Sequence, residues 1–449
     1  MANTKLPDGP QESPFFQLVK WTSDPLSYLD TCSERYGDIF TLRMAGYAPH
    51  IFLSDPQAIK EIFTADPALY DCSLETKVAQ PIVGENALLV QDGVSHQRLR
   101  RMLMPAFHAK QIQTYSQLIC ERTRQVANRW GVGQPFEVRA AMIEIAADVI
   151  MHLVFGSYEG ERYQKIKLHL AATLDVTNSS PYLLLFKFMQ KDLGAWSPWG
   201  RFQRQRNKVY EFFQAEINDH RTQPEIADNT LLSVVMSARD EKGQALTDAE
   251  LKDLLMNALF GGYDTTAIAL TWALYWIHKM PQVREKLLDE IDSLGSDPDP
   301  MAITRLPYLN AVCSETLRIH PSIFYAFPRV PKSPVQIMGY QFDAGTRLVP
   351  SIYLLHRRED LYPESSQFQP DRFIDRQFSP YEYMPFGGGN RGCIGVALAM
   401  FQMKLVLATI LSDYQLALAD TEPVKPKRIG LIIAPSDVRM VLQGRRRHL

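Results

Sequence analysis

The sequence contains little cysteine, and its cysteines form no recognisable structural motif. There are only five among 449 residues, an odd and scattered set that excludes a disulfide framework as the basis of the fold. Neither a CxxC pair nor a CxxCH sequence occurs, so we expect neither a zinc ribbon nor a covalently attached c-type haem. The five are Cys32, Cys72, Cys120, Cys313 and Cys393.

Net charge and long apolar runs are also lacking. Lys+Arg total 48 and Asp+Glu total 50, a formal net charge of −2, so we expect no nucleic acid or anionic membrane as partner. No run of about 18 apolar residues predicts a membrane span. Lys5, Asp8 and Glu12 stand where a signal peptide needs an apolar core. We therefore expect a soluble cytoplasmic protein.

The composition is otherwise that of a globular protein, with 46% hydrophobic and 22% charged residues. Apolar periodicity indicates helices over most of the chain between about 95 and 295, and β-like runs are confined to both ends. We expect one compact unit over 1–449, mainly α with a small β portion. The other expected segments are an irregular start over 1–25, strands at 39–42 and 50–53, a helix opening at 54–56, β structure over 329–350 and an apolar helix over about 394–411.

One long helix is the most informative segment. Thr247 and Glu250 form a capping box, and Pro281 ends the helix about 33 residues later, a length of about 50 Å. Its faces are apolar almost all round, which is typical of a buried helix. Its middle nevertheless reads GGYDTT over 261–266. A glycine inside a helix costs about 1 kcal/mol relative to alanine, and a buried carboxylate must be paired, so this stretch indicates function.

A second unusual stretch, FGGGNRGCIG over 386–395, surrounds Cys393. The cysteine precedes an apolar helix, whose free N–H groups and dipole favour a thiolate. The flanking glycines let a flat ligand approach the backbone, and Arg391 offers a cation to a carboxylate. A thiolate axial ligand of haem needs this combination. The alternative is an ordinary buried cysteine.

The same stretch also fits a dinucleotide-binding pattern. Gly387, Gly389 and Gly392 match G-x-G-x-x-G, and Asp413 follows about 20 residues later. The context argues against this interpretation. Residues 379–385 contain two prolines and do not form a buried strand, and too little chain follows for a doubly wound sheet.

Five motifs, in the family's order, resemble those of the cytochromes P-450. The resemblance spans nearly the whole chain and is to soluble bacterial, particularly cyanobacterial, members. It implies the cytochrome P-450 fold with a long central helix across the distal haem face, haem b with Cys393 as axial thiolate, and a monooxygenase activity. The motifs are Phe386-x-x-Gly389-x-Arg391-x-Cys393-x-Gly395 of the haem-thiolate loop, Glu315-x-x-Arg318, Arg372 in FQPDRF, Gly262-x-Asp264-Thr265 of the oxygen-binding helix, and His96-x-x-x-Arg100 of the propionate-binding helix.

The resemblance implies that Glu315, Arg318 and Arg372 form a buried network that braces the haem-binding loop. The role is structural rather than catalytic. Glu315 and Arg318 are three residues apart on a helix opened by Pro307, so they share a face. The alternative is a solvated pair, which would contribute little to stability.

The resemblance also implies four partners for the haem propionates. They are His96, Arg100, Arg391 and, by position, Arg329. Two-pronged arginine–carboxylate geometry suits this task, and imidazole donates a hydrogen bond to a carboxylate. The alternative for Arg100 is a solvated helix face, because two further arginines flank it.

Asp264 and Thr265 are expected over the distal face of the iron. A threonine hydroxyl both donates and accepts hydrogen bonds, and a nearby acid relays protons from water during oxygen activation. Gly261 and Gly262 leave room for dioxygen. The alternative for Thr265 is a hydrogen bond to a carbonyl one turn earlier. Peroxide-using relatives typically replace this pair, so its presence favours a monooxygenase that uses O2.

The substrate pocket is placed by resemblance, and its candidate residues are mostly apolar. They indicate a sizeable apolar substrate such as a long-chain fatty acid or terpenoid, with a simple core role as an equal alternative for each segment. Residues 182–186 are expected to form the access lid. The candidates are Leu88, Phe260, Gly261, Phe324, Ala326 and Ile432.

Electrons are expected from separate partners, a ferredoxin and its reductase or a flavodoxin, because no part of the chain resembles a flavin or nicotinamide domain. Arg98 and Arg101 share a helix face that suits an acidic carrier, with a solvated face as the alternative. We expect a monomer. Two other functions stay open: a haem-thiolate isomerase or dehydratase of the same fold that does not use O2, and a haem-binding sensor without turnover.

Overall fold

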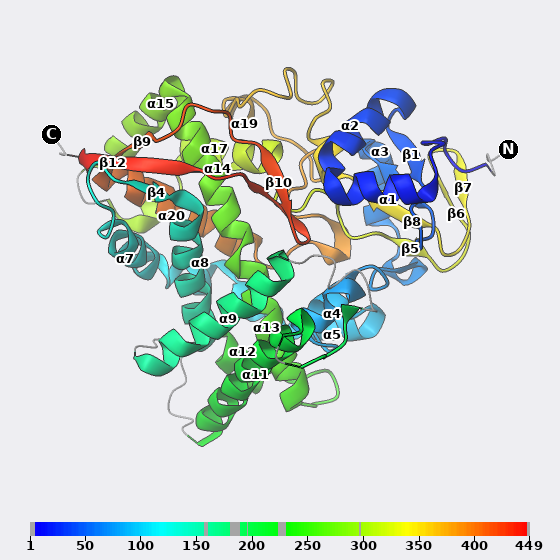
Figure 1. Cartoon of the computed structure of the whole chain (residues 1–449), viewed down its shortest axis with the longest axis horizontal. Coiled ribbons are helices and arrows are strands. Elements are labelled where there is room, and N and C mark those ends of the chain that lie inside the picture. Colours follow the sequence, from blue (N-terminus) through cyan, green and yellow to red (C-terminus); the bar gives the residue numbers. More distant parts are fainter. Residues whose placement is uncertain are drawn as a thin grey trace.

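Helices form most of the molecule, as the sequence predicts. The structure is a computed structural model that describes residues 5–156, 160–179, 189–194, 196–222, 230–295 and 298–446, without the side chains of 176–179. Figure 1 shows the helices packed around α14, with most of the strands at the N-terminal end and along one edge. The α-helices are α1 (Pro14–Ser23), α2 (Pro25–Tyr36), α3 (Pro56–Thr64), α4 (Gln80–Val83), α5 (Gly93–Leu103), α6 (Ala109–Gln113), α7 (Ser116–Ala127), α8 (Val138–Phe155), α9 (Glu161–Ser179), α11 (Pro198–Thr222), α12 (Leu231–Ser237), α13 (Asp248–Tyr263), α14 (Thr265–Lys279), α15 (Pro281–Asp292), α16 (Pro300–Ile303), α17 (Pro307–Ile319), α18 (Ile352–Leu355), α19 (Arg372–Asp375) and α20 (Val396–Asp413).

Most strands come from the two ends of the chain, which confirms the expected small β portion, but β4 comes from the stretch expected to be helical. In one sheet β1 and β2 are antiparallel, and β2 runs parallel to β8, with Phe52 opposite Val349. In another, β12 lies between β4 and β9. The strands are β1 (Ile39–Leu42), β2 (His50–Leu53), β3 (Tyr70–Asp71), β4 (Pro135–Glu137), β5 (Val330–Pro331), β6 (Val335–Ile337), β7 (Tyr340–Phe342), β8 (Arg347–Pro350), β9 (Tyr414–Leu418), β10 (Pro426–Ile429), β11 (Ile432–Pro435) and β12 (Arg439–Arg445); the 3₁₀ segments are η1 (Pro67–Leu69), η2 (Thr76–Ala79), η3 (Leu88–Val90), η4 (Met104–Phe107) and η6 (Gly389–Arg391).

The N-terminal segment is partly helical, so the expectation of an irregular start over 1–25 was wrong. The side chain of Ser13 caps α1, and Pro14 is its first helical residue. The amide of buried Gln17 donates to the carbonyl of Pro10 at 3.0 Å and accepts from the backbone N–H of Arg43 at 2.7 Å. These tertiary contacts hold a helix that the local composition alone does not indicate.

The predicted central helix is two helices that meet at Asp264. The capping box of Thr247 and Glu250 is present at the start of α13, as expected. Asp264 has φ −100° and ψ −36° and separates α13 from α14. The hydroxyl of Thr265 donates to the carbonyl oxygen of Gly261 at 2.7 Å. A hydroxyl that bonds back to the preceding turn, next to paired glycines, favours a local distortion of a helix.

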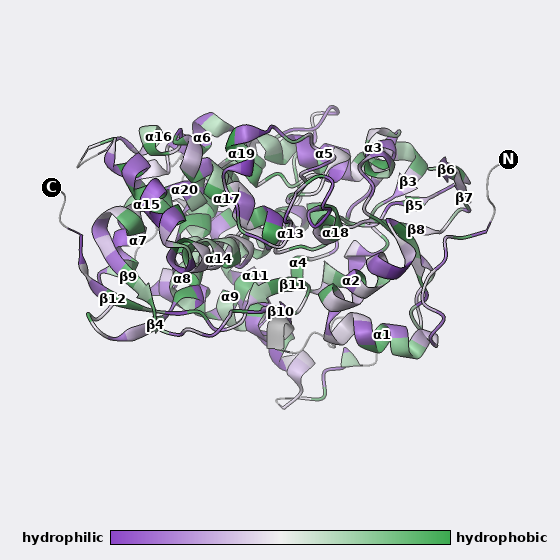
Figure 2. Ribbon diagram, turned by 90° about the horizontal axis from the view of Figure 1, so that it is seen from above, coloured by the Kyte–Doolittle hydropathy of each residue, from purple (hydrophilic) through white to green (hydrophobic). Residues whose placement is uncertain are grey.

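The core lies around α14, which contacts α8, α17 and α20. Figure 2 views α14 nearly end-on, with these helices beside it. Among the described residues, α20 is the one helix long and apolar enough to cross a membrane, and 56% of it is buried in the fold. Its packing against α7, α14 and α17 accounts for its apolar composition.

Candidate functional site

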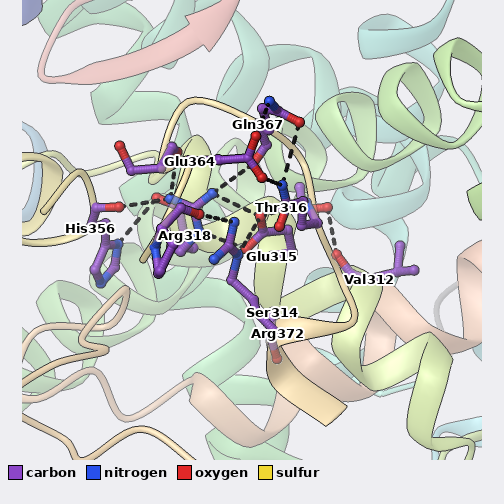
Figure 3. A network of polar contacts seen from close by, with 12 residues as sticks. Val312, Ser314, Glu315, Thr316, Arg318, His356, Glu364, Gln367 and Arg372 are labelled. Carbon is purple, nitrogen blue, oxygen red and sulfur yellow. Dashed lines mark hydrogen bonds and ion pairs between the residues drawn. The ribbon is translucent and has the colours of Figure 1, made fainter. Parts of the chain in front are cut away.

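Glu315, Arg318 and Arg372 form a buried network, which rules out the solvated pair. Pro307 opens α17, and both Glu315 and Arg318 on this helix have no exposed surface. The Glu315 carboxylate accepts from Arg318 Nε at 2.6 Å and Nη2 at 2.8 Å, and from Arg372 Nε at 3.2 Å. Figure 3 shows the three side chains converging. Such two-pronged, desolvated geometry is the strong form of an ion pair.

Arg318 also holds three backbone carbonyls of the irregular segment that precedes the Cys393 loop. Its Nη1 donates to the carbonyls of His356 at 2.7 Å and Ser365 at 2.8 Å, and its Nη2 donates to that of Gln367 at 3.0 Å. Figure 3 shows Arg318 with His356 and Gln367 near it. Since this segment has little regular structure of its own, the arginine supplies the donors that a helix or sheet would otherwise provide.

His356 connects this network to the Cys393 loop, and the sequence analysis missed it. Its Nδ1 lies 3.2 Å from the Arg318 carbonyl, and its Nε2 accepts from the backbone N–H of Met384 at 3.0 Å. Burial, followed by the charge of Arg318, lowers the pKa of His356 to about 3. The ring is therefore neutral and carries its proton on Nδ1. Its lone position in the sequence offers no motif that would have revealed this role.

Cys393 lies in a tight loop before α20. Its backbone N–H donates to the carbonyl of Phe386 at 3.0 Å, and its sulfur accepts from the N–H of Gly395 at 3.3 Å. Gly388 is required for close packing here, because a Cβ at that position would lie 2.3 Å from the ring of Phe63. The thiol is exposed, whereas the other four cysteines are buried, so the ordinary buried cysteine does not describe it.

Two neighbours of Cys393 favour its thiolate, as its place before a helix predicts, but burial outweighs them in the protein alone. Burial among protein atoms raises the pKa of the Cys393 thiol, and the N–H of Gly395 and the charge of Arg100 oppose this only in part. The thiol keeps solvent-accessible surface, although many protein atoms lie around it. A metal cation bound to the sulfur would deprotonate it outright.

His96, Arg100, Arg329 and Arg391 come together at one place, as the resemblance implied. Burial and the charges of Arg391, Arg100 and Arg329 lower the pKa of His96 to about 3, and Asp92 opposes the arginines. Arg100 turns inward and donates to the carbonyl of Gly392 at 2.8 Å, so it is not on a solvated face. Buried Arg329 donates to the carbonyls of Phe327 at 2.7 Å and Gly388 at 3.1 Å.

This cluster fits a group with two carboxylates. Arg391 pairs with Asp92 at 2.8 Å, yet its buried Nε has no hydrogen-bond partner in the described part of the chain. Three guanidinium groups thus surround a neutral histidine with one carboxylate among them. Buried charge is stable only when it is paired. The cluster therefore suits the propionates of haem, and the exposed thiol of Cys393 suits its iron.

Asp264 is paired with an arginine that the sequence analysis missed. Arg139, at the start of α8, donates from Nη2 to the Asp264 carboxylate at 2.7 Å, and both side chains are largely buried. This pairing is what allows the carboxylate to stay buried. The back-bond of the Thr265 hydroxyl to Gly261, given above as an alternative, is present. A hydroxyl that donates to a carbonyl still has lone pairs to accept a hydrogen bond.

The candidate pocket residues do not share one environment. Phe324 is 1% exposed and packs against Trp21 and Tyr325 in a separate N-terminal cluster, so it takes the core alternative. Leu88 and Ala326 are buried, Phe260 and Ile432 are half-buried, and Gly261 is exposed. The expected lid at 182–186 lies outside the described residues.

A cavity of about 940 Å³ lies between the N-terminal part of the molecule and α11 and α13. Its apolar lining includes Trp21, Phe52, Phe202 and Leu431. Its polar lining includes His50, Glu75, Arg206, Tyr210, Asp253 and Arg428. This volume is within the range of small-molecule sites.

We expected Arg98 to face a redox carrier, but its side chain is occupied by other contacts. It forms ion pairs with Asp240 at 2.8 Å and Glu250 at 2.7 Å and is largely covered. Arg101 is 58% exposed and pairs with Glu241, which is more exposed still. Of the two, only Arg101 presents its charge to solvent.

Comparison with known proteins identifies relatives over almost the entire chain. The model of the family described as Cytochrome P450 matches residues 7–441. Cytochrome P450 135B1 of Mycobacterium tuberculosis is 34% identical over 431 residues, covering 96% of this chain and 89% of the relative. Cytochrome P450 135A1 of the same species is 30% identical over 419 residues, covering 93% and 90%.

Two solved structures share the fold. The retinoic acid-bound cyanobacterial CYP120A1 superposes with a TM-score of 0.83 at 23% identity, covering 98% of this chain and 99% of the other. The cytochrome P450DA heme domain superposes with a TM-score of 0.87 at 21% identity, covering 100% and 99%. The expected fold is confirmed by both structures, and the relatives at 30% identity or more given above are mycobacterial.

Proposed function

The chain belongs to the cytochrome P450 family and is a haem-thiolate monooxygenase, and we propose that Cys393 is the thiolate ligand of its haem iron. The observation that carries the proposal is the exposure of Cys393 next to a cluster of three arginines and a histidine, while the four other cysteines are buried. The bound haem supplies O2 binding and reductive cleavage of the O–O bond.

We propose that His96, Arg100, Arg329 and Arg391 hold the haem propionates. The unpartnered Nε of Arg391 and the excess of guanidinium groups around neutral His96 support this role. Two propionates would balance the charge that Asp92 alone leaves unpaired. Glu315, Arg318 and Arg372 act indirectly, by fixing the irregular segment that precedes the Cys393 loop.

We propose that Asp264 and Thr265 deliver protons on the distal side. The Thr265 hydroxyl, fixed to Gly261 O, presents a lone pair to a water or to the reacting oxygen. The Asp264 carboxylate is held by Arg139 and must leave this arginine before it can take a proton from solvent. The strength of the ion pair therefore controls how readily Asp264 relays protons. The presence of both residues supports a reaction that uses O2 over an isomerase or dehydratase.

We propose an apolar substrate, a long-chain fatty acid or a terpenoid, and hydroxylation as the reaction. The cavity of about 940 Å³, whose lining combines aromatic and aliphatic side chains with polar ones, supports a substrate of this size. CYP120A1 binds retinoic acid, an isoprenoid carboxylic acid, and shares the fold of this chain. We propose a ferredoxin with its reductase, or a flavodoxin, as electron donor, and a soluble, cytoplasmic monomer.

The deciding experiment is the absorption spectrum of the dithionite-reduced, CO-bound protein, beside Cys393→Ala and the control Cys32→Ala. We expect a strongly red-shifted Soret band in wild type and control, and its loss in Cys393→Ala. A red-shifted band that persists in Cys393→Ala would contradict the assignment of the ligand. An unshifted band in the wild type would mean that another group, or a protonated thiol, holds the iron.

The substrate class is tested by the spectral shift on adding palmitic acid or retinoic acid, followed by turnover with ferredoxin, its reductase and NADPH. We expect a Soret shift with at least one of the two and O2 uptake matched by hydroxylated product. Product without O2 uptake would favour the isomerase or dehydratase, and binding without turnover the sensor.

A further inference from the structure

Two side chains of α13 hold the segment Gly84–Val90 by its backbone. Asp253 Oδ2 accepts from both the backbone N–H and the side-chain amide of Asn86, each at 2.9 Å. Asn257 Oδ1 accepts from the backbone N–H of Leu89 at 2.9 Å. Asp253 and Asn257 are four residues apart and therefore lie on one face of the helix. The segment has two fixed points, one helical turn apart.

The same carboxylate is also tied to α11. The Tyr210 hydroxyl donates to Asp253 Oδ1 at 2.7 Å. Arg206 donates from Nη2 to the Tyr210 oxygen at 2.9 Å and from Nε to the carbonyl of Ile82 at 3.2 Å. Asp253 thus joins three elements that are far apart in the sequence. We call Asn86, Tyr210, Asp253 and Asn257 the clasp.

The surroundings of Asp253 suit a buried carboxylate that is held by hydrogen bonds. The residue is 5% exposed, and a buried carboxylate is tolerated only when its oxygens are hydrogen-bonded. Here three donors serve its two oxygens. Gly84 has φ +91°, and a Cβ there would lie 1.9 Å from Asp253 Oδ1. Glycine is what lets the backbone come this close to the acid.

Three members of the clasp, Asn86, Tyr210 and Asp253, belong to the wall of the cavity of about 940 Å³. Gly84 lines the cavity as well. Asn257 lies one turn further along α13, in the direction of Gly261 and Asp264. Leu88, a candidate pocket residue, lies in the segment between the two fixed points. Along α13, the clasp therefore lies between Ala249, which lines the cavity, and Gly261 and Asp264 on the proposed distal side.

We propose that Asp253 and Asn257 are positioning residues that hold Gly84–Val90 as a gate between the cavity and the haem, and that the clasp opens when a ligand passes. The link from Asp253 through Tyr210 couples this gate to α11. The inference rests on the proposed function, since it takes the haem as the destination of the ligand.

The first test measures hydrogen–deuterium exchange over residues 84–91 in the holoenzyme. Asp253→Asn keeps the shape but leaves one acceptor oxygen for three converging donors. We expect the Asn86 amide to exchange about tenfold faster, because a hydrogen bond to a charged group is lost. The matched control is Asp248→Asn, since Asp248 also links α13 to α11, through Gln214 and Arg221, without touching the segment.

The second test measures how fast 4-phenylimidazole, added as a probe, reaches the haem in a stopped-flow Soret assay. We expect its association rate to rise severalfold in Asp253→Asn and in Tyr210→Phe, and to stay unchanged in Asp248→Asn. Tyr210→Phe keeps the ring in place, so it tests the coupling to α11 should Asp253→Asn fold poorly.

Unchanged exchange and unchanged association rates in both clasp variants would overturn the proposal, as would equal acceleration in the Asp248→Asn control. The CO-bound spectrum separates this outcome from failure of the proposed function. If Cys393 does not hold the haem, the spectrum of the wild type shows it, whereas the exchange measurement reports on the clasp directly.

Discussion

The imidazole Nε2 of His356 accepts a hydrogen bond from the backbone N–H of Met384 at 3.0 Å. The other ring nitrogen faces the carbonyl of Arg318 at 3.2 Å. One neutral ring thus connects the Glu315–Arg318–Arg372 network to the chain two residues before Phe386, where the Cys393 loop begins. The resemblance implied that the network braces the Cys393 loop. The contact that does so is made by His356, which lies outside the network's motifs.

This neutral ring predicts an acid-sensitive fold. The pKa of His356 is lowered to about 3, while an unfolded histidine titrates near 6.5. Between these values the unfolded state binds one more proton than the native state, so stability falls as the pH drops from about 6.5 towards 3. The contribution is about 1.4 kcal/mol per pH unit. We expect the slope of the unfolding free energy between pH 6 and 4 to be about that much smaller in His356→Gln, measured by urea unfolding. An identical slope would contradict a neutral buried His356.

Breaking the buried network should be severe. Glu315→Gln leaves Arg318 buried without its counter-charge, which costs about 3–5 kcal/mol. We expect a loss of that order in urea unfolding and little haem retained after purification. The control is Glu161→Gln, which removes an exposed pair with Lys165 four residues away and should change stability little. A stable Glu315→Gln protein with full haem would show that the network does not brace the loop.

Replacing the distal hydroxyl should uncouple the reaction. In Thr265→Ala we expect haem binding to persist while reducing equivalents yield hydrogen peroxide in place of product. Thr271→Ala is a close control, because Thr271 makes the same bond to a carbonyl one turn earlier, Ala267 O at 2.7 Å, further along α14. Peroxide and product are measured against NADPH consumed. Full coupling in Thr265→Ala would contradict the proton-delivery role.

The rate of reduction by the electron donor should depend on the charge of Arg101 rather than on that of Arg98. Charge reversal in Arg101→Glu is expected to slow reduction by ferredoxin severalfold at low ionic strength, with the difference shrinking as salt screens the charges. Arg439→Glu removes another exposed, paired arginine on β12, away from α5 (Figure 1), and should leave the rate unchanged. Equal rates for wild type and Arg101→Glu at low salt would place the docking surface elsewhere. Arg98→Glu is expected to disturb folding instead, since it breaks two ion pairs.

Local sequence patterns correctly predicted those features that depend on interactions between residues close in the sequence. The capping box at Thr247, the start of α17 at Pro307 and the shared face of Glu315 and Arg318 follow from spacing along a helix, and all are present. Where contacts with distant segments of the chain shape an element, the local sequence pattern did not predict it. Helix α1 has a local cap in Ser13 but is also held by the distant contact of Gln17 with Arg43, and the break at Asp264 interrupts a periodicity that continues through it.

By itself, the sequence determined the helical class, the β segments at both ends, and the order of motifs that places the chain among the cytochromes P450. These features depend on residue types at fixed spacing. Only the tertiary structure decided which side chains complete the site. Arg139 reaches Asp264 across 125 residues, His356 bonds Met384 across 28, and Asn86 bonds Asp253 across 167. A buried charge takes as its partner whatever donor the fold brings within hydrogen-bond distance, and no spacing along the chain encodes that choice.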